Sequence, residues 1–204
     1  MLFRSVPLVG VYNVRNALAA IAVGHDVGLD MSAVAEGLRT FAGVKHRLEV
    51  VGTASGVTVY DDFAHHPTAV EETLTGLRAA NKGARIWAVF EPRSASSCRR
   101  VFQADFARAF GAADEIVLAP VFRASLPETE RLSIDQLVAD LQAQGRSACA
   151  PPSVDAIIET VVARHRPGDL VVLMSNGGFG GIHHRLLRAL TTRAAGAAPP
   201  AGRG

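Results

Sequence analysis

Residues 169–190 read DLVVLMSNGGFGGIHHRLLRAL, and this stretch decides the fold class. Its first part, Asp169 to Met174, is an almost continuous apolar run, which is typical of a strand buried on both faces of a parallel sheet. Its last part, Ile182 to Leu190, carries apolar residues at helical spacing. A buried strand that leads through a glycine-rich loop into an amphipathic helix is the repeating unit of an α/β fold.

The same alternation of strand and helix covers most of the chain. We expect strands at residues 48–53, 57–61, 85–90, 115–119 and 147–150, and helices at 69–80, 97–110, 134–144 and 154–165. Ser55 and Gly56 form a turn signal between the first two strands, so that pair is expected to be antiparallel. The sequence therefore predicts an α/β domain with a mostly parallel sheet that has helices on both faces.

The two ends of the chain differ from this pattern. Two amphipathic helices, at residues 13–27 and 31–41, come before the alternating region, and two helices alone cannot form a core. We interpret residues 1–42 as the end of another domain and residues 43–190 as the α/β domain. Residues 191–204 are rich in Ala, Gly and Pro and are expected to be a disordered tail.

Composition excludes several classes of protein. The net charge is +2, and the 21 basic residues are scattered, so nothing indicates binding to nucleic acid. No apolar run approaches the roughly 20 residues that a membrane helix needs, so no membrane association is expected. Cys98 and Cys149 are far apart and form no CxxC motif. A reducing cytoplasmic compartment is therefore the expected location.

Ligands of open α/β sheets bind beyond the carboxyl ends of the strands, where three unusual loops follow expected strands. The first contains DDFAHHPTAV, with Asp61 and Asp62 at the strand end and His65 and His66 before a helix. This cluster could ligate a metal, bind a nucleotide ribose through a carboxylate, or perform acid/base chemistry through a histidine. The structural alternative is a capped loop with solvated histidines.

The second loop reads FEPRSASSCRR, from Phe90 to Arg100. It places Arg93 and the hydroxyls of Ser94, Ser96 and Ser97 at an expected helix start, where backbone N–H groups favour an anion. Arg93 could hold a carboxylate or phosphate with its two-pronged guanidinium. Alternatively, a serine caps the helix and the arginines are surface charges.

The third loop reads MSNGGFGGIHH, from Met174 to His184. Its four glycines permit close backbone approach to a ligand. The loop fails the GxGxxG dinucleotide motif because His183 occupies the last glycine position, so NAD binding is disfavoured. A tight structural turn would need fewer glycines. The chain also has no GxxxxGK[ST] motif, so it cannot form a phosphate-cradling P-loop by itself.

Four segments in order resemble the C-terminal portion of the Mur ligases, ATP-dependent enzymes that add amino acids or peptides to UDP-N-acetylmuramate. GVYNVRNALAA, from Gly10 to Ala20, resembles the GxHNxxNxxAA element that ends their central ATPase domain. KHRLE, from Lys45 to Glu49, resembles their HRxE element, and DDFAHHPTA resembles their nucleotide-contacting loop. The remainder is similar to their Rossmann-like third domain. Tyr12 occupies a position where the family usually has His.

The resemblance implies roles for individual residues. Asn13 and Asn16 would contact adenine, Arg47 the ATP phosphates and Asp62 the ribose, with His65 and His66 lining the same cleft. Arg47, His65 and His66 are thus the candidate catalytic residues. The residues that would position the incoming peptide are Arg93, Ser175, Asn176, Gly177, Gly178, Gly180 and His183. Mg²⁺ would be held mostly by the central domain, so no metal ligands are assigned to this chain.

FEPRS and MSNGGFGGIH resemble the branch of the family that joins L-Ala-γ-D-Glu-meso-diaminopimelate to UDP-N-acetylmuramate in peptidoglycan recycling. DDFAHHPTA is shared with the L-alanine-adding branch, which remains an alternative. Because the P-loop is absent, this chain alone is expected to be inactive and to need the upstream ligase domains. Two hypotheses of other classes stay open: a metal-dependent phosphoesterase that uses Asp61, Asp62, His65 and His66, and a non-catalytic nucleotide-binding module.

Overall fold

One sheet with the strand order β1-β2-β6-β3-β4-β5 organises the chain. The computed structural model describes residues 8–122 and 125–196. The strands are β1 (Glu49–Ala54), β2 (Val57–Asp62), β3 (Ile86–Phe90), β4 (Glu115–Leu118), β5 (Ser147–Cys149) and β6 (Leu170–Met174). β1 and β2 form an antiparallel hairpin, and the other neighbouring pairs are parallel. The predicted mostly parallel sheet is therefore confirmed.

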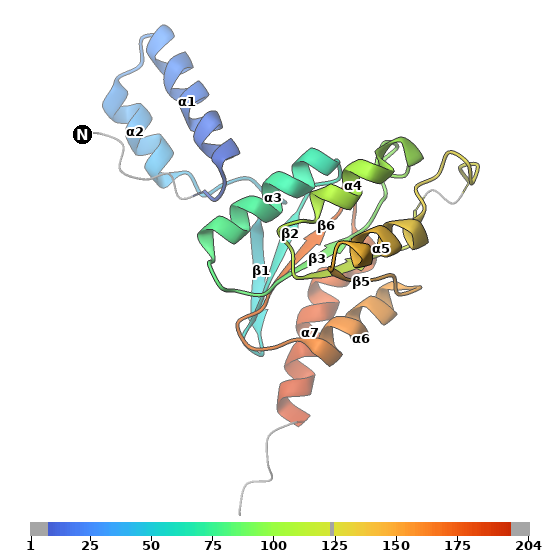
Figure 1. Cartoon of the computed structure of the whole chain (residues 1–204). Coiled ribbons are helices and arrows are strands. Elements are labelled where there is room, and N and C mark those ends of the chain that lie inside the picture. The colour runs from blue at the N-terminus through green and yellow to red at the C-terminus, as the bar shows by residue number, and fades with distance from the viewer. Residues whose placement is uncertain (1–7, 123–124, 197–204) are drawn as a thin grey trace, which may run out of the picture.

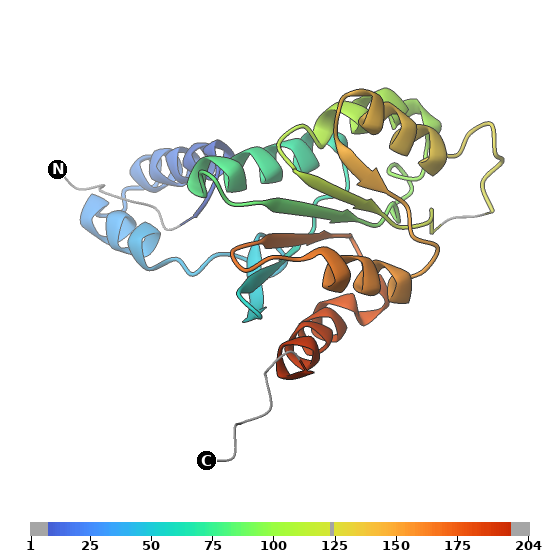
Figure 2. The ribbon, with the colours of Figure 1, turned by 60° about the horizontal axis from the view of Figure 1, so that its bottom comes forward.

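Helices cover both faces of this sheet. On one face lie α3 (Pro67–Ala80), α4 (Gln103–Ala109) and α5 (Ile134–Ala143), and on the other lie α6 (Val154–Arg164) and α7 (Ile182–Gly196), as Figure 2 shows. Every residue of β3 is buried, and successive residues face opposite layers. Phe90 packs with the first helix layer, whereas Trp87 packs with the second. Two apolar layers thus hold the sheet between them.

The two N-terminal helices form a hairpin that projects from this body beside α3 (Figure 1). They are α1 (Val11–Asp26) and α2 (Met31–Thr40), and Asp30 caps α2 because its carboxylate accepts a hydrogen bond from Ser32 N at 3.1 Å. The backbone of α3 at Gly76 packs closely against the backbone at Gly10, just before α1, because a Cβ on Gly76 would lie 3.0 Å from the Cα of Gly10. The large apolar side chains of α1, such as Leu18 at 60% exposure, are not covered.

The helix predicted at residues 97–110 is shorter in the structure. A 3₁₀ turn, η1 (Arg100–Phe102), precedes α4, which begins at Gln103. Arg100 N donates to the Glu130 carbonyl at 2.7 Å, and Leu132 N donates to the Cys98 carbonyl at 2.8 Å. These backbone groups pair across to residues 130–132, so they are not available to extend the helix.

The predicted tail also differs. α7 continues to Gly196, so the expectation of disorder is wrong for residues 191–196. The hydroxyls of Thr191 and Thr192 donate to carbonyls one turn back, and the alanines that follow favour a helix. Residues 197–204 lie outside the described residues, as do residues 1–7 of the expected upstream domain. None of the described helices is long and apolar enough to span a membrane.

Candidate functional site

Two adjoining hollows, which we call the helix groove, lie where α1 approaches the start of β1 and α3. One has a volume of about 760 Å³ and the other about 330 Å³, and both are lined by Tyr12 and Arg47. Among the residues predicted to contact a nucleotide, the helix groove brings together Asn13, Asn16, Arg47, Asp62 and His66. The structure therefore places three separate sequence motifs around one cavity.

Asp62 is the buried carboxylate of the helix groove, with 1% exposure. Its Oδ1 accepts hydrogen bonds from Ala64 N at 2.8 Å and Thr73 Oγ1 at 3.3 Å, and its Oδ2 accepts from Leu48 N at 2.8 Å. Burial raises the pKa of the Asp62 carboxyl, and the hydrogen bonds from Ala64 and Leu48 oppose this rise. Asp62 thus anchors the segment that carries Arg47 as well as lining the groove.

The backbone around Arg47 has an unusual conformation. His46 and Leu48, its two neighbours, have φ values of 58° and 47°, in the left-handed region that residues other than glycine seldom adopt. The His46 carbonyl accepts a hydrogen bond from Phe63 N at 2.8 Å, and the Arg47 guanidinium lies over the Phe63 ring, 5.4 Å from its centroid. Within the described residues Arg47 forms no ion pair with a carboxylate. An exposed guanidinium held in this way is suited to bind an anion.

Tyr12 separates the two hollows of the helix groove. A Cβ on Gly10, whose φ is 99°, would lie 2.4 Å from Tyr12 Cε1, so the ring packs directly against that glycine. Burial raises the pKa of the Tyr12 hydroxyl, the Asp62 carboxylate adds to the rise, and Arg47 opposes it. Tyr12, which stands where the resembling family usually has His, therefore forms part of the wall of the helix groove.

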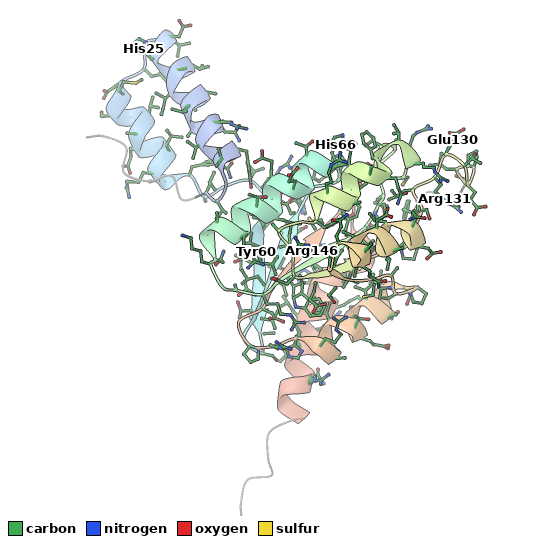
Figure 3. All side chains as sticks on the ribbon, viewed as in Figure 1. His25, Tyr60, His66, Glu130, Arg131 and Arg146 are labelled. Atoms are coloured by element: carbon green, nitrogen blue, oxygen red, sulfur yellow. The ribbon has the colours of Figure 1, made fainter. Side chains whose placement is uncertain are left out.

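The two histidines of the DDFAHHPTA loop point to different surroundings. The Nδ1 of His65 lies 2.8 Å from the Phe63 carbonyl, and His65 does not line the helix groove. His66 precedes the first turn of α3 and packs edge-on against Phe102, 4.9 Å between centroids, at the end of α3 near α4 (Figure 3). The four residues of the phosphoesterase hypothesis therefore do not converge on one point.

A second cavity of about 620 Å³, which we call the glycine groove, lies at the carboxyl ends of β2 and β6. Its lining includes most of the residues predicted to bind a peptide, together with Asp61: Asp61, Ser175, Asn176, Gly177, Gly178 and His183. Ser175 Oγ donates to Glu91 Oε2 at 2.6 Å and accepts from Gly177 N at 3.0 Å. The Oδ1 of Asn176 is buried and has no hydrogen-bond partner in the described part of the chain.

Arg93 lies at the border of the glycine groove. A Cβ on Gly177 would lie 2.3 Å from Arg93 Nε, so the arginine can lie there only because residue 177 has no side chain. The Arg93 guanidinium also lies 3.7 Å from the centroid of the Phe122 ring and 3.7 Å from Glu91 Oε1. Gly180 lies outside the groove, with a φ of 57° and its Cα facing Val154 of α6.

The serines near Arg93 do not lie at a helix start as predicted. Ser94 Oγ accepts a hydrogen bond from Ser97 N at 2.9 Å and closes a local turn, while α4 begins later in the chain. The helix terminus expected at these serines is therefore not there, and the N–H of Ser97 is already bonded to Ser94. Arg93 remains as the cationic group of this loop.

Sequence reasoning did not assign site roles to His46 and Glu49. Together with Asp61 they place one potential ligand atom each within 4.8 Å of one another, so they form the group in the described residues that could hold a metal ion. These atoms are already hydrogen-bonded, because the His46 Nδ1 lies 2.6 Å from Asp61 Oδ2 and His46 N donates to Glu49 Oε2 at 2.9 Å. The sequence feature that could have indicated a site role for His46 and Glu49 is their position beside Arg47 in the KHRLE segment.

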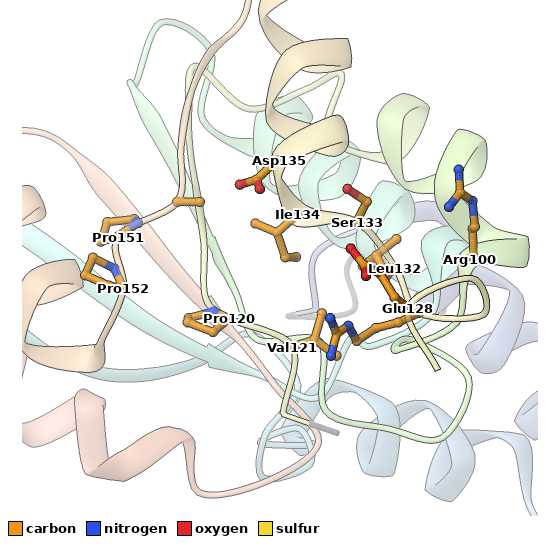
Figure 4. Close-up of a pocket in the computed structure, with 12 residues that line it drawn as sticks. Arg100, Pro120, Val121, Glu128, Leu132, Ser133, Ile134, Asp135, Pro151 and Pro152 are labelled. Carbon is orange, nitrogen blue, oxygen red and sulfur yellow. The ribbon is translucent and has the colours of Figure 1, made fainter. Parts of the chain in front are cut away.

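A third cavity of about 440 Å³ lies beyond the carboxyl ends of β4 and β5 (Figure 4). Its walls carry charges of both signs, from Arg100 and Arg131 and from Glu128 and Asp135. No sequence motif indicated this cavity, because its lining comes from short segments that are far apart along the chain.

Comparison with known proteins agrees with the fold and the motifs. A family model described as "Mur ligase, glutamate ligase domain" matches residues 46–177. The chain belongs to the Mur ligase family.

Individual relatives include both branches of that family. A UDP-N-acetylmuramate–L-alanyl-γ-D-glutamyl-meso-2,6-diaminoheptandioate ligase of Escherichia coli K12 is 42% identical over 193 residues, which cover 92% of this chain and 39% of the relative. A UDP-N-acetylmuramate–L-alanine ligase of Agrobacterium fabrum is 41% identical over 175 residues, which cover 85% of this chain and 37% of the relative. The crystal structure of a murein peptide ligase from Psychrobacter arcticus superposes with a TM-score of 0.68 at 35% identity, covering 90% of this chain and 38% of that one. The chain thus spans about two-fifths of the length of such relatives.

Proposed function

We propose that this chain is the C-terminal part of an ATP-dependent ligase that joins L-Ala-γ-D-Glu-meso-diaminopimelate to UDP-N-acetylmuramate. In this reaction ATP phosphorylates the muramate carboxylate, and the free amine of the peptide displaces phosphate to form an amide. The observation that carries the proposal is that the Arg93 side chain packs against Gly177 beside the glycine groove. A cation at this position suits a substrate with several carboxylates. The relative from E. coli, 42% identical, bears the name of this activity.

We assign the nucleotide to the helix groove. Asn13 and Asn16 would face adenine, and the exposed Arg47 guanidinium would bind phosphate oxygens with its parallel N–H groups. Asp62 would contribute to ribose binding through the lone pairs that its three donors leave free. Because Asp62 is already engaged in this way, it is poorly placed to hold Mg²⁺, which we expect to bind the nucleotide phosphates and upstream domains.

We assign the peptide to the glycine groove and Arg93. Arg93 would bind a peptide carboxylate, and the unpartnered Oδ1 of Asn176 would accept a hydrogen bond from a peptide N–H or ammonium. His66 would line the nucleotide side, whereas His65, hydrogen-bonded to its own loop, is not assigned a catalytic role. The reaction would then depend on positioning of the amine and on stabilisation of phosphate charge by Arg47.

The exposed face of α1 supports a role for upstream ligase domains. Val11, Val14 and Leu18 lie at helical spacing on one side of α1 and are 63%, 53% and 60% exposed, respectively, and apolar side chains gathered on one face mark a contact surface. We propose that this face packs against the domain that supplies the P-loop and the UDP-sugar site. The assembled enzyme would act in the cytoplasm, where its ATP is available.

A fusion tests this proposal. The part of the E. coli relative that precedes its matched segment is joined to this chain, and we call the product the fusion ligase. With ATP, Mg²⁺ and UDP-N-acetylmuramate, it should join the tripeptide, whereas the 204-residue chain alone should hydrolyse no ATP. Free L-alanine serves as the competing substrate, because the L-alanine ligase of A. fabrum is almost as similar. A clear preference for L-alanine would reject the tripeptide assignment.

A further inference from the structure

The adjacent carboxylates Asp61 and Asp62 hold the Arg47 segment from two sides. Asp62 accepts a hydrogen bond from Leu48 N, and Asp61 Oδ2 lies 2.6 Å from His46 Nδ1. The two residues they bind are the left-handed neighbours of Arg47. A backbone in this conformation persists only where surrounding contacts hold it, so both carboxylates help to fix the direction in which Arg47 points.

His46 also resolves an electrostatic conflict in the β1–β2 hairpin. Glu49 and Asp61 are directly paired across the two strands, where like charges destabilise a sheet. His46 bonds to both, through its backbone N to Glu49 Oε2 at 2.9 Å and through its ring to Asp61. Because the conformation of His46 is tied to both carboxylates, a displacement of Asp61 would be transmitted to the backbone beside Arg47.

The second oxygen of Asp61 is bound from the glycine groove. His183 Nε2 lies 3.1 Å from Asp61 Oδ1, and both side chains are largely buried, at 16% and 13% exposure. His183 lies at the start of α7, directly after the glycine-rich loop. A continuous chain of contacts therefore runs from the glycine groove through His183, Asp61 and His46 to Arg47.

We infer that Asp61 and His183 are positioning residues that couple the glycine groove to the arginine of the helix groove. A ligand that orders the start of α7 fixes His183, which fixes Asp61, which in turn holds the Arg47 segment in its left-handed conformation. Where it concerns catalysis, this inference rests on the proposed function: binding of the peptide and alignment of Arg47 with the nucleotide become linked. The mechanical coupling itself is a property of the chain alone.

Hydrogen exchange on the 204-residue chain tests the coupling without any ligase activity. His183→Leu, which removes the ring nitrogen that contacts Asp61, should accelerate amide exchange in residues 45–49 by about threefold to tenfold, which corresponds to loss of one net hydrogen bond. Asp61→Ala should do the same. The control is His184→Leu, because His184 lines the same groove but makes no hydrogen bond or ion pair to Asp61. Exchange in β3, measured in parallel, shows whether the whole fold has loosened.

Kinetics of the fusion ligase provide the second measurement. His183→Leu should raise the KM for ATP by about threefold to tenfold at saturating peptide, although His183 lies in the other groove. The coupling is refuted if exchange at residues 45–49 in His183→Leu equals that of the wild type or of His184→Leu. It is also refuted if His183→Leu raises only the KM for peptide. An inactive wild-type fusion would count against the proposed function, and the exchange result would still decide the coupling.

Discussion

Gly177→Ala should displace Arg93 without straining the backbone. Gly177 has no positive φ, so an alanine fits its conformation, but the added Cβ would lie 2.3 Å from Nε, 2.5 Å from Cδ and 2.9 Å from Cζ of Arg93. Real Cβ atoms do not approach other atoms so closely, so the arginine side chain must leave this position. By adding one methyl group, the substitution therefore moves a cation that is far away in the sequence but in direct contact in the structure.

The size of the effect follows from the contacts that Arg93 would lose. Its interaction with the Phe122 ring contributes roughly 0.5–2 kcal/mol and its ion pair with Glu91 up to about 1 kcal/mol, so the free energy of unfolding should fall by no more than about 3 kcal/mol. A charged hydrogen bond to a peptide carboxylate contributes roughly 1.5–3 kcal/mol. Gly177→Ala should therefore raise the KM of the fusion ligase for the tripeptide by roughly 10-fold to 100-fold.

Gly178→Ala provides the matched control. A Cβ at Gly178 would meet nothing within 4 Å, and its φ is −72°, so this variant should keep its stability and its KM for ATP. Arg93→Ala should reproduce the effect of Gly177→Ala, and the double variant should add little because both changes remove one interaction. If Gly177→Ala bound the tripeptide as the wild type does, the assignment of Arg93 to the substrate would be refuted.

Three further predictions concern other parts of the molecule. Burial would raise the pKa of Glu115, but the hydrogen bond from Ser147 and the charges of two arginines lower this pKa below the usual 4.5. The ionised Glu115 therefore stabilises the folded protein above pH 4.5, and this stabilisation is lost as the pH falls through the lowered pKa. Glu115→Gln should thus reduce the melting temperature at pH 7, and this difference should shrink as the pH falls through the lowered pKa of Glu115. Gly180 has a φ of 57°, and a Cβ added there would lie 3.1 Å from the side chain of Val154. Gly180→Val should therefore lower the free energy of unfolding, measured with urea, by about 1–3 kcal/mol. Arg47→Ala in the fusion ligase should lower kcat, with Arg47→Lys partly restoring it; an unchanged kcat in steady-state assays would contradict the role of Arg47 in binding phosphate.

Local sequence signals predicted most of the fold. The apolar runs of β3 and β6 and the Ser55–Gly56 turn specified a mostly parallel sheet with one hairpin, and the structure confirms this arrangement. The prediction failed at residues 97–102, where helix-forming residues instead pair with residues 130–132. That pairing depends on a segment about thirty residues away, which local propensity does not report.

The sequence indicated which residues form the site, but not the hydrogen bonds and side-chain contacts that link them. Motifs indicated Arg47, Asp62 and the glycine-rich loop, and the fold gathers them around two grooves. The positive φ of His46 could not be predicted, since it arises from hydrogen bonds to Glu49 and Asp61 that form only when β1 and β2 pair. The reason for a glycine at position 177 was likewise hidden, because it is the close contact with the side chain of Arg93, which comes from the loop after β3.

The two outer strands of the sheet have a consequence for how the molecule behaves in a crowded solution. An uncovered strand edge offers free N–H and C=O groups to a second molecule and can start aggregation. Here β5 is only three residues long, and the pairing register of β1 shifts between Val50 and Gly52. A short edge and a distorted edge are poor templates for further strands, so the domain is protected against sheet-to-sheet polymerisation while its α1 face stays open to a partner.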